Sequence, residues 1–464
     1  MTSFLEKVAE NLPEVSKPSQ KKLSFKEKAK WTLIILVLFF VLGLVPLYGL
    51  GHNALQQFEY LSMILGAKFG SIISLGIGPI VTASIVLQLL TGSGILKFDL
   101  TTIEGKKKFQ GLQKILALTF IVFEGAIYVF MGGLSPDPLL AGTALYFQLQ
   151  LLIILQLILG GILILFMDEV ISKWGFSSGI SLFIAAGVSE TIFIGLLSPL
   201  SPTGSESAAG AIPAMIQNIV AGNPTGAALM LSIIVATALV FIAAVYMQSM
   251  RVEIPLSFGR VRGQGIRWPL QFVYTSNIPV ILVAALLANV QLLAHLLQNA
   301  GRPILGTFIG NQPDSGFVAW IFPPNLIEKI ITQTLTIMDV AHSFVYILFM
   351  VIGCVIFSWF WVQTAGMDSK AQAKHMVAAG LQIPGFRRDE RILEKLLDRY
   401  ILPLTIMGAI SVGLLAALAD LTGAVGTGTG ILLTVMIVYK LYEEIAQQHM
   451  MDMNPMMRKF MGGE

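Results

Sequence analysis

Long apolar runs recur along the chain with lengths that predict membrane-crossing helices. A helix needs about 20 mostly apolar residues to cross the hydrocarbon layer, because each residue advances it by about 1.5 Å. Nine runs meet this requirement: 32–50, 112–132, 144–167, 179–198, 227–248, 270–294, 339–362, 401–419 and 430–447. The pattern therefore predicts a helical bundle embedded in a membrane.

A tenth segment has a broken pattern. Residues 53–71 are mixed in character and contain Glu59 and Lys68. Several glycines and Pro79 follow, and the apolar stretch 80–90 after them is too short to cross alone. We expect a short amphipathic helix that dips into the membrane and a second piece that completes the crossing. The total of ten crossings puts both termini on the same side.

The N-terminal tail, residues 1–30, is charged, and no small-residue cleavage site follows the first apolar run. The sequence therefore predicts that this run is kept as a membrane helix rather than removed as a signal. Ser24-Phe25-Lys26-Glu27 has the S/T-x-x-E form of a capping box, which predicts the start of a surface amphipathic helix. That helix would lie along the membrane face and lead into the first crossing.

Basic residues lie almost entirely on one side of the predicted membrane. Of the 30 Lys and Arg residues, all but Lys68, Arg302 and Lys329 fall in the two tails or in loops on the same side as the tails. Loops rich in Lys and Arg face the cytosol. Both termini, including the C-terminal tail 448–464, are therefore predicted to be cytosolic, in a multi-pass protein of the cytoplasmic membrane.

Composition excludes several classes of protein. Hydrophobic residues make up 55% of the 464 residues, charged residues only 12%, and the mean hydropathy is +0.77. Soluble domains carry about 25% charged residues. An ordinary soluble enzyme, a disordered chain and a nucleic-acid-binding domain are therefore excluded. The single cysteine, Cys354, allows no intrachain disulfide, and the five histidines show no metal-ligand spacing.

Two glycine-rich stretches resemble catalytic motifs but lack the required context. Residues 175–179 match G-x-S-x-G, yet a membrane helix rather than a strand is predicted before them, which argues against a hydrolase. Residues 426–430 are not G-x-G-x-x-G, and no lysine follows as in a P-loop. We therefore expect neither an enzyme nor a cofactor site.

Acidic residues inside the predicted helices are few. Glu124 and Glu190 lie within crossings, and Asp339 begins one. An ionisable group in the membrane is a functional candidate by default, but each could also lie near an interface or bond a neighbouring helix. Their isolation argues against an ion-coupled transporter, which would bring several such groups together.

Two loops on the basic side, 249–268 and 363–400, are longer than a connection requires. One interpretation is that their arginines serve only to set the topology. The other is that they form a docking face for a polyanion such as ribosomal RNA or for an acidic protein surface. The length of the loops favours docking. On the opposite side, the loop 199–226 is poor in charge and is predicted to be a flexible cap.

Branched apolar residues accompany two further glycine-rich stretches. Ile77 and Val81 are four residues apart, as are Ile180 and Ile184, so each pair lies on one helix face. Spacing alone favours ordinary helix packing. Six longer stretches, however, closely resemble the SecY family of protein-conducting channels, and its archaeal form most of all. They are GIGPIVTASIVLQLL (76–90), KFQGLQK (108–114), MDEVISKWGFSSGISLFIAAG (167–187), MRVEIPLSFGRVRG (250–263), SNIPVILVAALLAN (276–289) and GTGILLTVMIVYKLYEE (428–444).

This resemblance implies an all-α membrane protein of ten helices in two inverted five-helix halves, 31–200 and 201–447, around an hourglass pore. A ring of apolar side chains would form its constriction: Ile77, Val81, Ile180, Ile184, Ile281 and Leu433. An apolar constriction excludes water and so blocks ions, and it offers no hydrogen bonds that would hold a sliding polypeptide.

The resemblance also implies a plug and a lateral gate. The plug would be the short helix at about 53–66, with Asn53, Leu55, Phe58, Leu61, Ile64 and Gly66. The gate would open toward lipid between the second and third helices and the seventh and eighth. Thr82 and Asn289 match polar gate positions, where an interhelical hydrogen bond is worth roughly 1 kcal/mol.

Partners follow from the same resemblance. We expect a SecE-type clamp subunit, a small Secβ-type subunit, secretory polypeptides with their signal sequences, and membrane lipid. The loops 249–268 and 363–400 match ribosome-docking loops, in which Arg260, Arg262, Arg387 and Arg388 are the candidate contacts.

The expected function is therefore the central pore of a protein translocase. It would pass unfolded polypeptides across the membrane and release apolar helices sideways into lipid. Two alternatives remain: a secondary transporter of small solutes, which would need a polar site at mid-membrane, and a scaffold or insertase without a pore, which would need neither plug nor ring.

Overall fold

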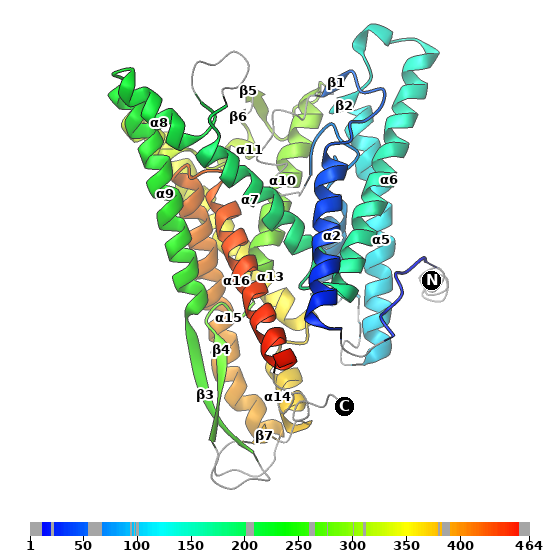
Figure 1. The fold of residues 1–464 in the computed structure, drawn as a ribbon, viewed down its shortest axis with the longest axis vertical. Helices are drawn as coiled ribbons and strands as arrows, with labels where there is room; N and C mark the ends of the chain where they lie inside the picture. The colour runs from blue at the N-terminus through cyan, green and yellow to red at the C-terminus, as the bar shows by residue number, and fades with distance from the viewer. Residues whose placement is uncertain are drawn as a thin grey trace.

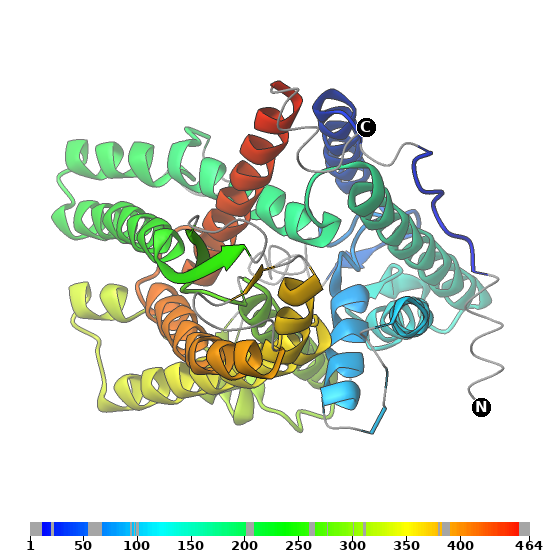
Figure 2. The ribbon, with the colours of Figure 1, turned by 90° about the horizontal axis from the view of Figure 1, so that it is seen from below.

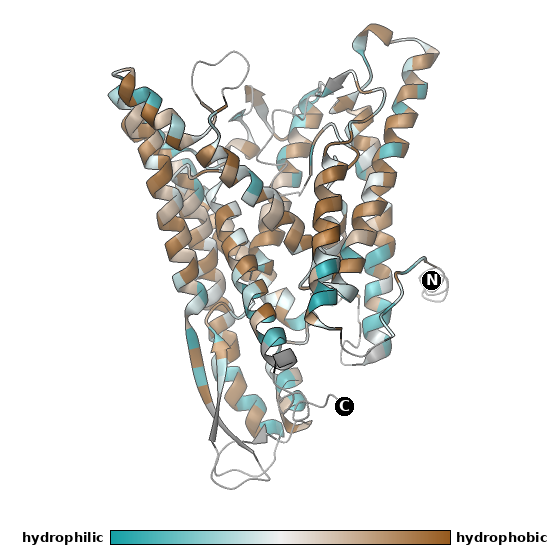
Figure 3. Cartoon of the chain, viewed as in Figure 1, coloured by the Kyte–Doolittle hydropathy of each residue, from teal (hydrophilic) through white to brown (hydrophobic). Residues whose placement is uncertain are grey.

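A computed structural model describes most of the chain: residues 12–19, 23–53, 67–92, 95–96, 98, 102–200, 208–258, 265–275, 277–299, 301–309, 312–378, 381–382 and 390–453. The described residues form mainly long helices that run along the length of the molecule (Figure 1). Their side chains are apolar over most of this length, and hydrophilic ones gather toward the lower ends in the view of Figure 3.

Seven described helices are long and apolar enough to cross a membrane: α5 (Ile103–Phe130), α6 (Ala144–Trp174), α7 (Gly179–Leu197), α9 (Pro224–Ser249), α10 (Ile278–Asn299), α13 (Ile337–Thr364) and α15 (Glu390–Leu421). Three more helices lie in the same bundle: α2 (Phe25–Gly43), α4 (Gly78–Gly92) and α16 (Gly428–Met453). The prediction of a multi-helix membrane protein is confirmed. Viewed from below, helices of the first part of the chain lie mainly on one side and those of the second part on the other (Figure 2).

The bundle has two distinguishable ends. Near the start of α2, Leu23 O accepts a hydrogen bond of 3.0 Å from Gln448 Nε2, which lies near the end of α16. Lys28 of α2 donates a second bond, of 3.3 Å, to the side-chain oxygen of the same glutamine. We call this the terminal end of the bundle and the opposite one the far end.

The boundary predictions are wrong at several helix ends. Run 32–50 stops being helical at Gly43, since Pro46, which has no N–H to continue a helix, forms a bridge with Ser71 instead. Run 270–294 begins with strand residues, and α10 starts only at Ile278. Ser24 caps α2 as predicted, through a bond of 3.4 Å from Glu27 N. However, α2 continues unbroken into the bundle, so the helix that begins after Ser24 is not a separate surface helix.

The fold is not purely helical, because three small sheets accompany the helices in the described part of the chain. Strands β3 (Arg251–Phe258), β4 (Gly265–Gln271) and β7 (Leu381–Gln382) form one antiparallel sheet in the order β4-β3-β7, with Arg251 opposite Gln271. The pairing of Ser257 with Gln382 joins the two long basic loops in one structure. The other sheets are β1 (His52–Asn53) with β2 (Leu134–Ser135), and β5 (Thr307–Ile309) with β6 (Gln312–Ser315).

Short helices complete the described fold: η1 (Pro138–Leu140), α8 (Ala211–Val220), α11 (Phe317–Trp320), α12 (Leu326–Ile331) and α14 (Ser369–Ala378). Helix α8 packs on α9, so the prediction of a flexible cap at 199–226 is wrong for this part of the loop. Helix α15 begins already at Glu390 and includes Pro403, so the basic loop 363–400 is shorter than predicted and contains α14.

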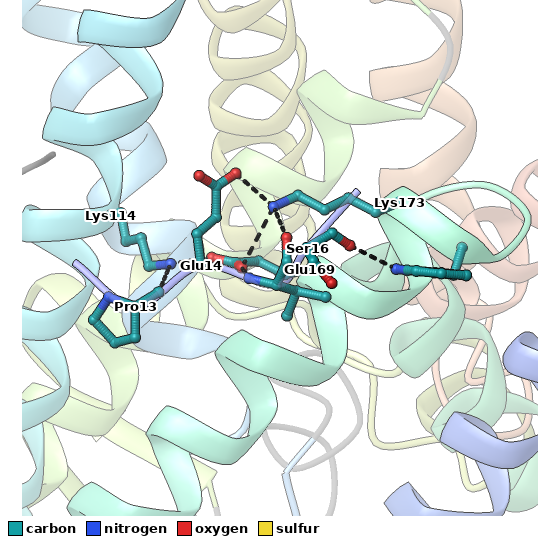
Figure 4. Close-up of polar contacts among 8 residues, drawn as sticks. Pro13, Glu14, Ser16, Lys114, Glu169 and Lys173 are labelled. Atoms are coloured by element: carbon teal, nitrogen blue, oxygen red, sulfur yellow. Dashed lines mark hydrogen bonds and ion pairs between the residues drawn. The ribbon is translucent and has the colours of Figure 1, made fainter. Parts of the chain in front are cut away.

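An extended N-terminal segment, residues 12–19, lies along the terminal ends of α5 and α6 (Figure 4). Side chains of these helices bind its backbone: Lys114 donates to Pro13 O at 2.6 Å, and Lys173 donates to Val15 O at 2.7 Å. Glu169 accepts from Val15 N at 3.0 Å and forms an ion pair with Lys114. We call this segment the strap, because it joins two helices at their ends.

Candidate functional site

The six predicted constriction residues belong to one hydrophobic cluster, although they come from four helices and a turn. Ile77 precedes α4, and Val81 lies on it; Ile180 and Ile184 lie on α7, Ile281 on α10 and Leu433 on α16. Five are buried, and Ile180 is partly buried against the same core. Helix α16 packs on α7 and α10, and α10 packs on α4, so the four helices form one continuous series of contacts.

A turn before α4 positions Ile77. Gly76 has a φ of +57°, a conformation that favours glycine, and its N–H donates to Ile73 O at 2.9 Å. Ile77 O then accepts from Val81 N at 3.0 Å, which starts the helix. Pro79 suits the first turn, because its missing N–H has no partner there in any helix. Ile77 and Val81 consequently lie one turn apart on the same face.

A polar contact joins three helices beside this apolar cluster. Asn289 of α10 donates a hydrogen bond of 2.9 Å to Thr82 Oγ1 of α4. The Thr82 hydroxyl has one proton and two acceptors in reach, Gly78 O at 2.8 Å and Glu124 Oε1 of α5 at 3.2 Å. The other oxygen of Glu124 is buried without a hydrogen-bond partner among the described residues. We call Thr82, Asn289 and Glu124 the gate contact.

The sequence predicted Thr82 and Asn289 as gate positions but left the role of Glu124 open. Their proximity links residues 207 positions apart in the chain. Because one hydrogen bond connects α10 to α4, the contact can bias these helices toward staying together without locking them. The structure therefore adds Glu124 to the site, and only the fold could reveal it.

The other two acidic candidates have different partners. Glu190 of α7 forms an ion pair of 2.7 Å with Lys68, whose ammonium also lies 5.7 Å from the centre of the Phe40 ring. Asp339 caps α13 in a capping box with Thr336 and binds Lys329. Their basic partners, Lys68 and Lys329, are two of the three basic residues predicted to lie on the side opposite the tails.

Much of the predicted plug and docking face lies outside the described residues. This applies to Leu55, Phe58, Leu61, Ile64 and Gly66 of the plug and to Arg260, Arg262, Arg387 and Arg388 of the docking loops. Asn53, at the start of the plug, is described, and its side chain donates to Phe69 O at 3.1 Å. The two ends of the segment 53–69 therefore lie close together.

The structure also shows the surroundings of the G-x-S-x-G match. Residues 175–179 lie between α6 and α7, with no strand before them, so the G-x-S-x-G match is not a nucleophile elbow. Among the described residues, no three His, Cys, Asp or Glu side chains are grouped so that they could hold a metal ion.

Comparison with known proteins decides the family. A family model described as SecY matches residues 71–442. The chain belongs to the SecY family. It is 47% identical to the protein translocase subunit SecY of Methanothermobacter thermautotrophicus over 456 residues, which cover 97% of each chain. It is 44% identical to the SecY of Pyrococcus furiosus over 466 residues, again 97% of each chain.

Solved structures agree with this assignment to the SecY family. One described as the structure of a protein conducting channel has a TM-score of 0.81 at 41% identity, covering 96% of this chain and 97% of that one. Sec61 in the canine ribosome-channel complex from the endoplasmic reticulum has a TM-score of 0.77 at 39% identity, with the same coverage. The resemblance inferred from the sequence is confirmed at the level of family and fold.

Proposed function

We propose that this chain is the central pore-forming subunit of a Sec protein translocase and not an enzyme. It passes unfolded secretory polypeptides across the cytoplasmic membrane and releases signal and transmembrane helices sideways into lipid. The observation that carries the proposal is the apolar cluster contributed by α4, α7, α10 and α16, with a weak polar contact between α4 and α10 beside it. Membership of the SecY family supports it.

The mechanism follows from the chemistry of these residues. Branched apolar side chains exclude water, so the closed constriction blocks ions, and they part around a polypeptide of any sequence because they make no specific hydrogen bonds with it. Separating α4 from α10 costs one interhelical hydrogen bond, roughly 1 kcal/mol. An apolar signal helix recovers more than this on entering lipid, since each buried CH₂ contributes about 0.8 kcal/mol.

The proposal includes a topology of ten crossings in two inverted halves around an hourglass pore, with residues 53–66 as the plug. Helices α2, α4 and α16 supply the three crossings beyond the seven long apolar helices. Both termini would be cytosolic, because the basic residues gather on that side. Labelling of single cysteines at both tails with an impermeant thiol reagent in sealed vesicles tests this orientation.

The proposed partners are a SecE-type subunit, a Secβ-type subunit and the ribosome. The pairing of β3 with β7 supports a common docking face, because it joins the two basic loops that carry Arg260, Arg262, Arg387 and Arg388. Sec61 in a ribosome-channel complex shares this fold. Charge reversal of these arginines should weaken ribosome binding, and the effect should be greatest at low salt.

Site-directed crosslinking tests the pore directly. Cysteines at Ile77, Ile180 or Ile281, in a Cys354→Ala background, should all crosslink to one secretory chain during arrested translocation. Leu239→Cys on α9 is the control, because that side chain is exposed on the outside of the bundle. Equal crosslinking at Leu239, or none at the three constriction positions, would exclude the pore.

Deleting residues 53–66 distinguishes the alternatives. A channel should leak ions without its plug, whereas an insertase without a pore should not. A small-solute transporter should instead show saturable uptake that the deletion need not change. Ion flux and solute uptake in the same proteoliposomes separate the three outcomes.

A further inference from the structure

Two helices of the proposed constriction begin in the same way, although they come from different halves of the chain. Helix α16 begins at Gly428, directly after the turn that follows α15. Helix α7 begins at Gly179, directly after the turn that follows α6. In both, an aspartate on the preceding helix accepts hydrogen bonds from the first turn of the new helix. The proposal below rests on the proposed function of that constriction.

Asp420, on the last turn of α15, holds the start of α16. Its Oδ1 accepts from Thr429 N at 2.7 Å, and its Oδ2 accepts from the Thr429 hydroxyl. Tyr346 of α13 donates a further bond of 2.6 Å to Oδ2. Asp420, Thr429 and Tyr346 are all buried, so these hydrogen bonds compensate the carboxylate for the loss of water. We call this group the Asp420 anchor.

The backbone fits closely at the same point. A Cβ atom at Gly428 would lie 2.0 Å from the carbonyl carbon of Ala419, so only glycine allows α16 to start this close to α15. Thr427, just before it, has a φ of +94°, a strained value for a residue with a side chain. Its hydroxyl oxygen accepts from Gly430 N at 3.0 Å. The start of α16 is thus fixed by several independent contacts.

Asp168 makes the corresponding contact for α7. Its Oδ1 accepts from Ile180 N at 3.0 Å, and a Cβ at Gly179 would lie 2.6 Å from the Asp168 Cα. We call Asp168 with Gly179 and Ile180 the Asp168 anchor. A negative charge at a helix N-terminus is favourable, because it pairs with unsatisfied N–H groups and the helix dipole.

The two anchors lie at opposite ends of the bundle. The α6–α7 turn is at the terminal end, because the ring of Phe176 packs at 5.5 Å from that of Phe25 at the start of α2. Helix α16 ends at the terminal end, so its anchored start lies at the far end (Figure 1). This is the relation that two inverted halves would give.

Each anchor lies close to a constriction residue. Ile180 is itself bound through its N–H, and Ile184 follows one turn later on the same face. Leu433 follows Thr429 by one turn on α16. We propose that Asp168 and Asp420 are paired positioning residues that set, from opposite ends, how α7 and α16 present Ile184 and Leu433 to the constriction.

Thiol reactivity at the two constriction positions tests this pairing. Ile184→Cys and Leu433→Cys are each made in a Cys354→Ala background and combined with Asp168→Asn or Asp420→Asn. The full channel complex is reconstituted in proteoliposomes, and the rate of modification by a small water-soluble maleimide is measured. Asp420→Asn should raise the rate at position 433 about tenfold and leave position 184 nearly unchanged. Asp168→Asn should do the reverse.

Milder variants keep the test valid if an aspartate variant fails to insert. Tyr346→Phe removes one donor of the Asp420 anchor and should raise the rate at position 433 by a smaller factor. Tyr128→Phe is its matched control, because the buried Tyr128 hydroxyl has no hydrogen-bond partner among the described residues. Asp137→Asn is the control for the aspartates, since Asp137 caps η1, away from the constriction.

The outcomes distinguish this inference from the proposed function. Equal effects of both aspartate variants at both positions, or effects no larger than those of the controls, would overturn the positioning role. If neither cysteine becomes protected when a secretory chain occupies the channel, the constriction itself is wrong. Protection by the secretory chain without the crossed pattern would refute only the anchors.

Discussion

The gate contact and the Asp420 anchor both join three membrane helices, but they bind them with very different strength. In the gate contact, a single threonine hydroxyl accepts from Asn289, and one oxygen of Glu124 has no partner among the described residues. In the Asp420 anchor, one buried carboxylate accepts three hydrogen bonds. This difference supports the proposal that α4 and α10 separate at the gate contact while the start of α16 stays fixed.

A buried carboxylate that receives three donors is costly to remove, because each of these hydrogen bonds loses its acceptor in the core. The gate contact leaves fewer unsatisfied groups when it opens, since Thr82 can still donate to Gly78 O. The lateral gate proposed above would need both kinds of contact.

Asp420→Leu should give the largest loss of stability. It removes the buried acceptor of the hydrogen bonds from the Tyr346 hydroxyl and the Thr429 N–H, which should cost roughly 3 kcal/mol. Thermal unfolding of the purified chain in detergent measures the effect. Asp137→Leu, at an exposed cap, is the control and should change little. Equal losses in the two variants would contradict the contrast.

Asp168→Leu should cost less, because the Asp168 anchor lacks a tyrosine from a third helix. The loss of its bond to Ile180 N should be about 1–2 kcal/mol, in the range of helix caps. The same unfolding measurement applies. A loss as large as that of Asp420→Leu would show that the contact with α13 adds nothing to the anchor.

The long helices could be predicted from the sequence, whereas some helix ends and the contacts between distant residues could not. Apolar runs predicted the long helices well, because burial in lipid demands length and hydrophobicity. The apolar pattern wrongly predicted a helix at Gln271, which belongs to a strand paired with β3, because a strand can be as apolar as the end of a helix. The predictions for Thr82 and Asn289 came from family resemblance, and the fold brought them into contact.

Asp420 was missed for a physical reason. Its partners Tyr346 and Thr429 are 74 and 9 residues away, so no local spacing reveals the group. A usable signal existed nonetheless: Asp168 lies about three helical turns before Gly179, and Asp420 about two turns before Gly428, and each glycine starts an apolar helix. An acidic residue near the end of one apolar helix and shortly before the glycine that starts the next predicts a side-chain cap at a point of close backbone packing. The apolar pattern alone does not predict such a cap.

Thr82→Val should have a smaller effect on stability but a clear effect on gating. It removes the only described hydrogen bond between α4 and α10 side chains, worth roughly 1 kcal/mol, so the open gate should become about fivefold more populated. Translocation of a precursor with a shortened apolar signal measures this bias. Thr434→Val is the matched control, because its buried hydroxyl has no partner among the described residues. Equal gains in both variants would exclude a gate role for the contact.

The strap should show the smallest effect, because its contacts lie at the surface. The hydrogen bond from Lys173 lowers the pKa of the Glu14 carboxyl below its ordinary value of 4.5. When docking lowers the pKa of a carboxyl group, the ionised group stabilises the docked state. This stabilisation is complete at pH values above the pKa of the undocked group, and it is lost as the pH falls through the pKa of the docked group. Strap docking should therefore be constant from pH 7 to about pH 5 and weaken below it.

Hydrogen exchange of the Val15 amide follows this docking, since Glu169 accepts from it. Protection should fall on acidification in the unmodified chain, and Glu14→Gln should show weaker protection at pH 7 with a shallower fall. Because Glu14 is largely exposed, solvent screens its ion pair, and the change at pH 7 should be small. A pH response in Glu14→Gln as steep as in the unmodified chain would exclude Glu14 as its source and leave the hydrogen bond from Val15 N to Glu169 as the contact that holds the strap. The strap would then resemble the anchors, with a partly buried carboxylate holding backbone in place, more than it resembles the gate.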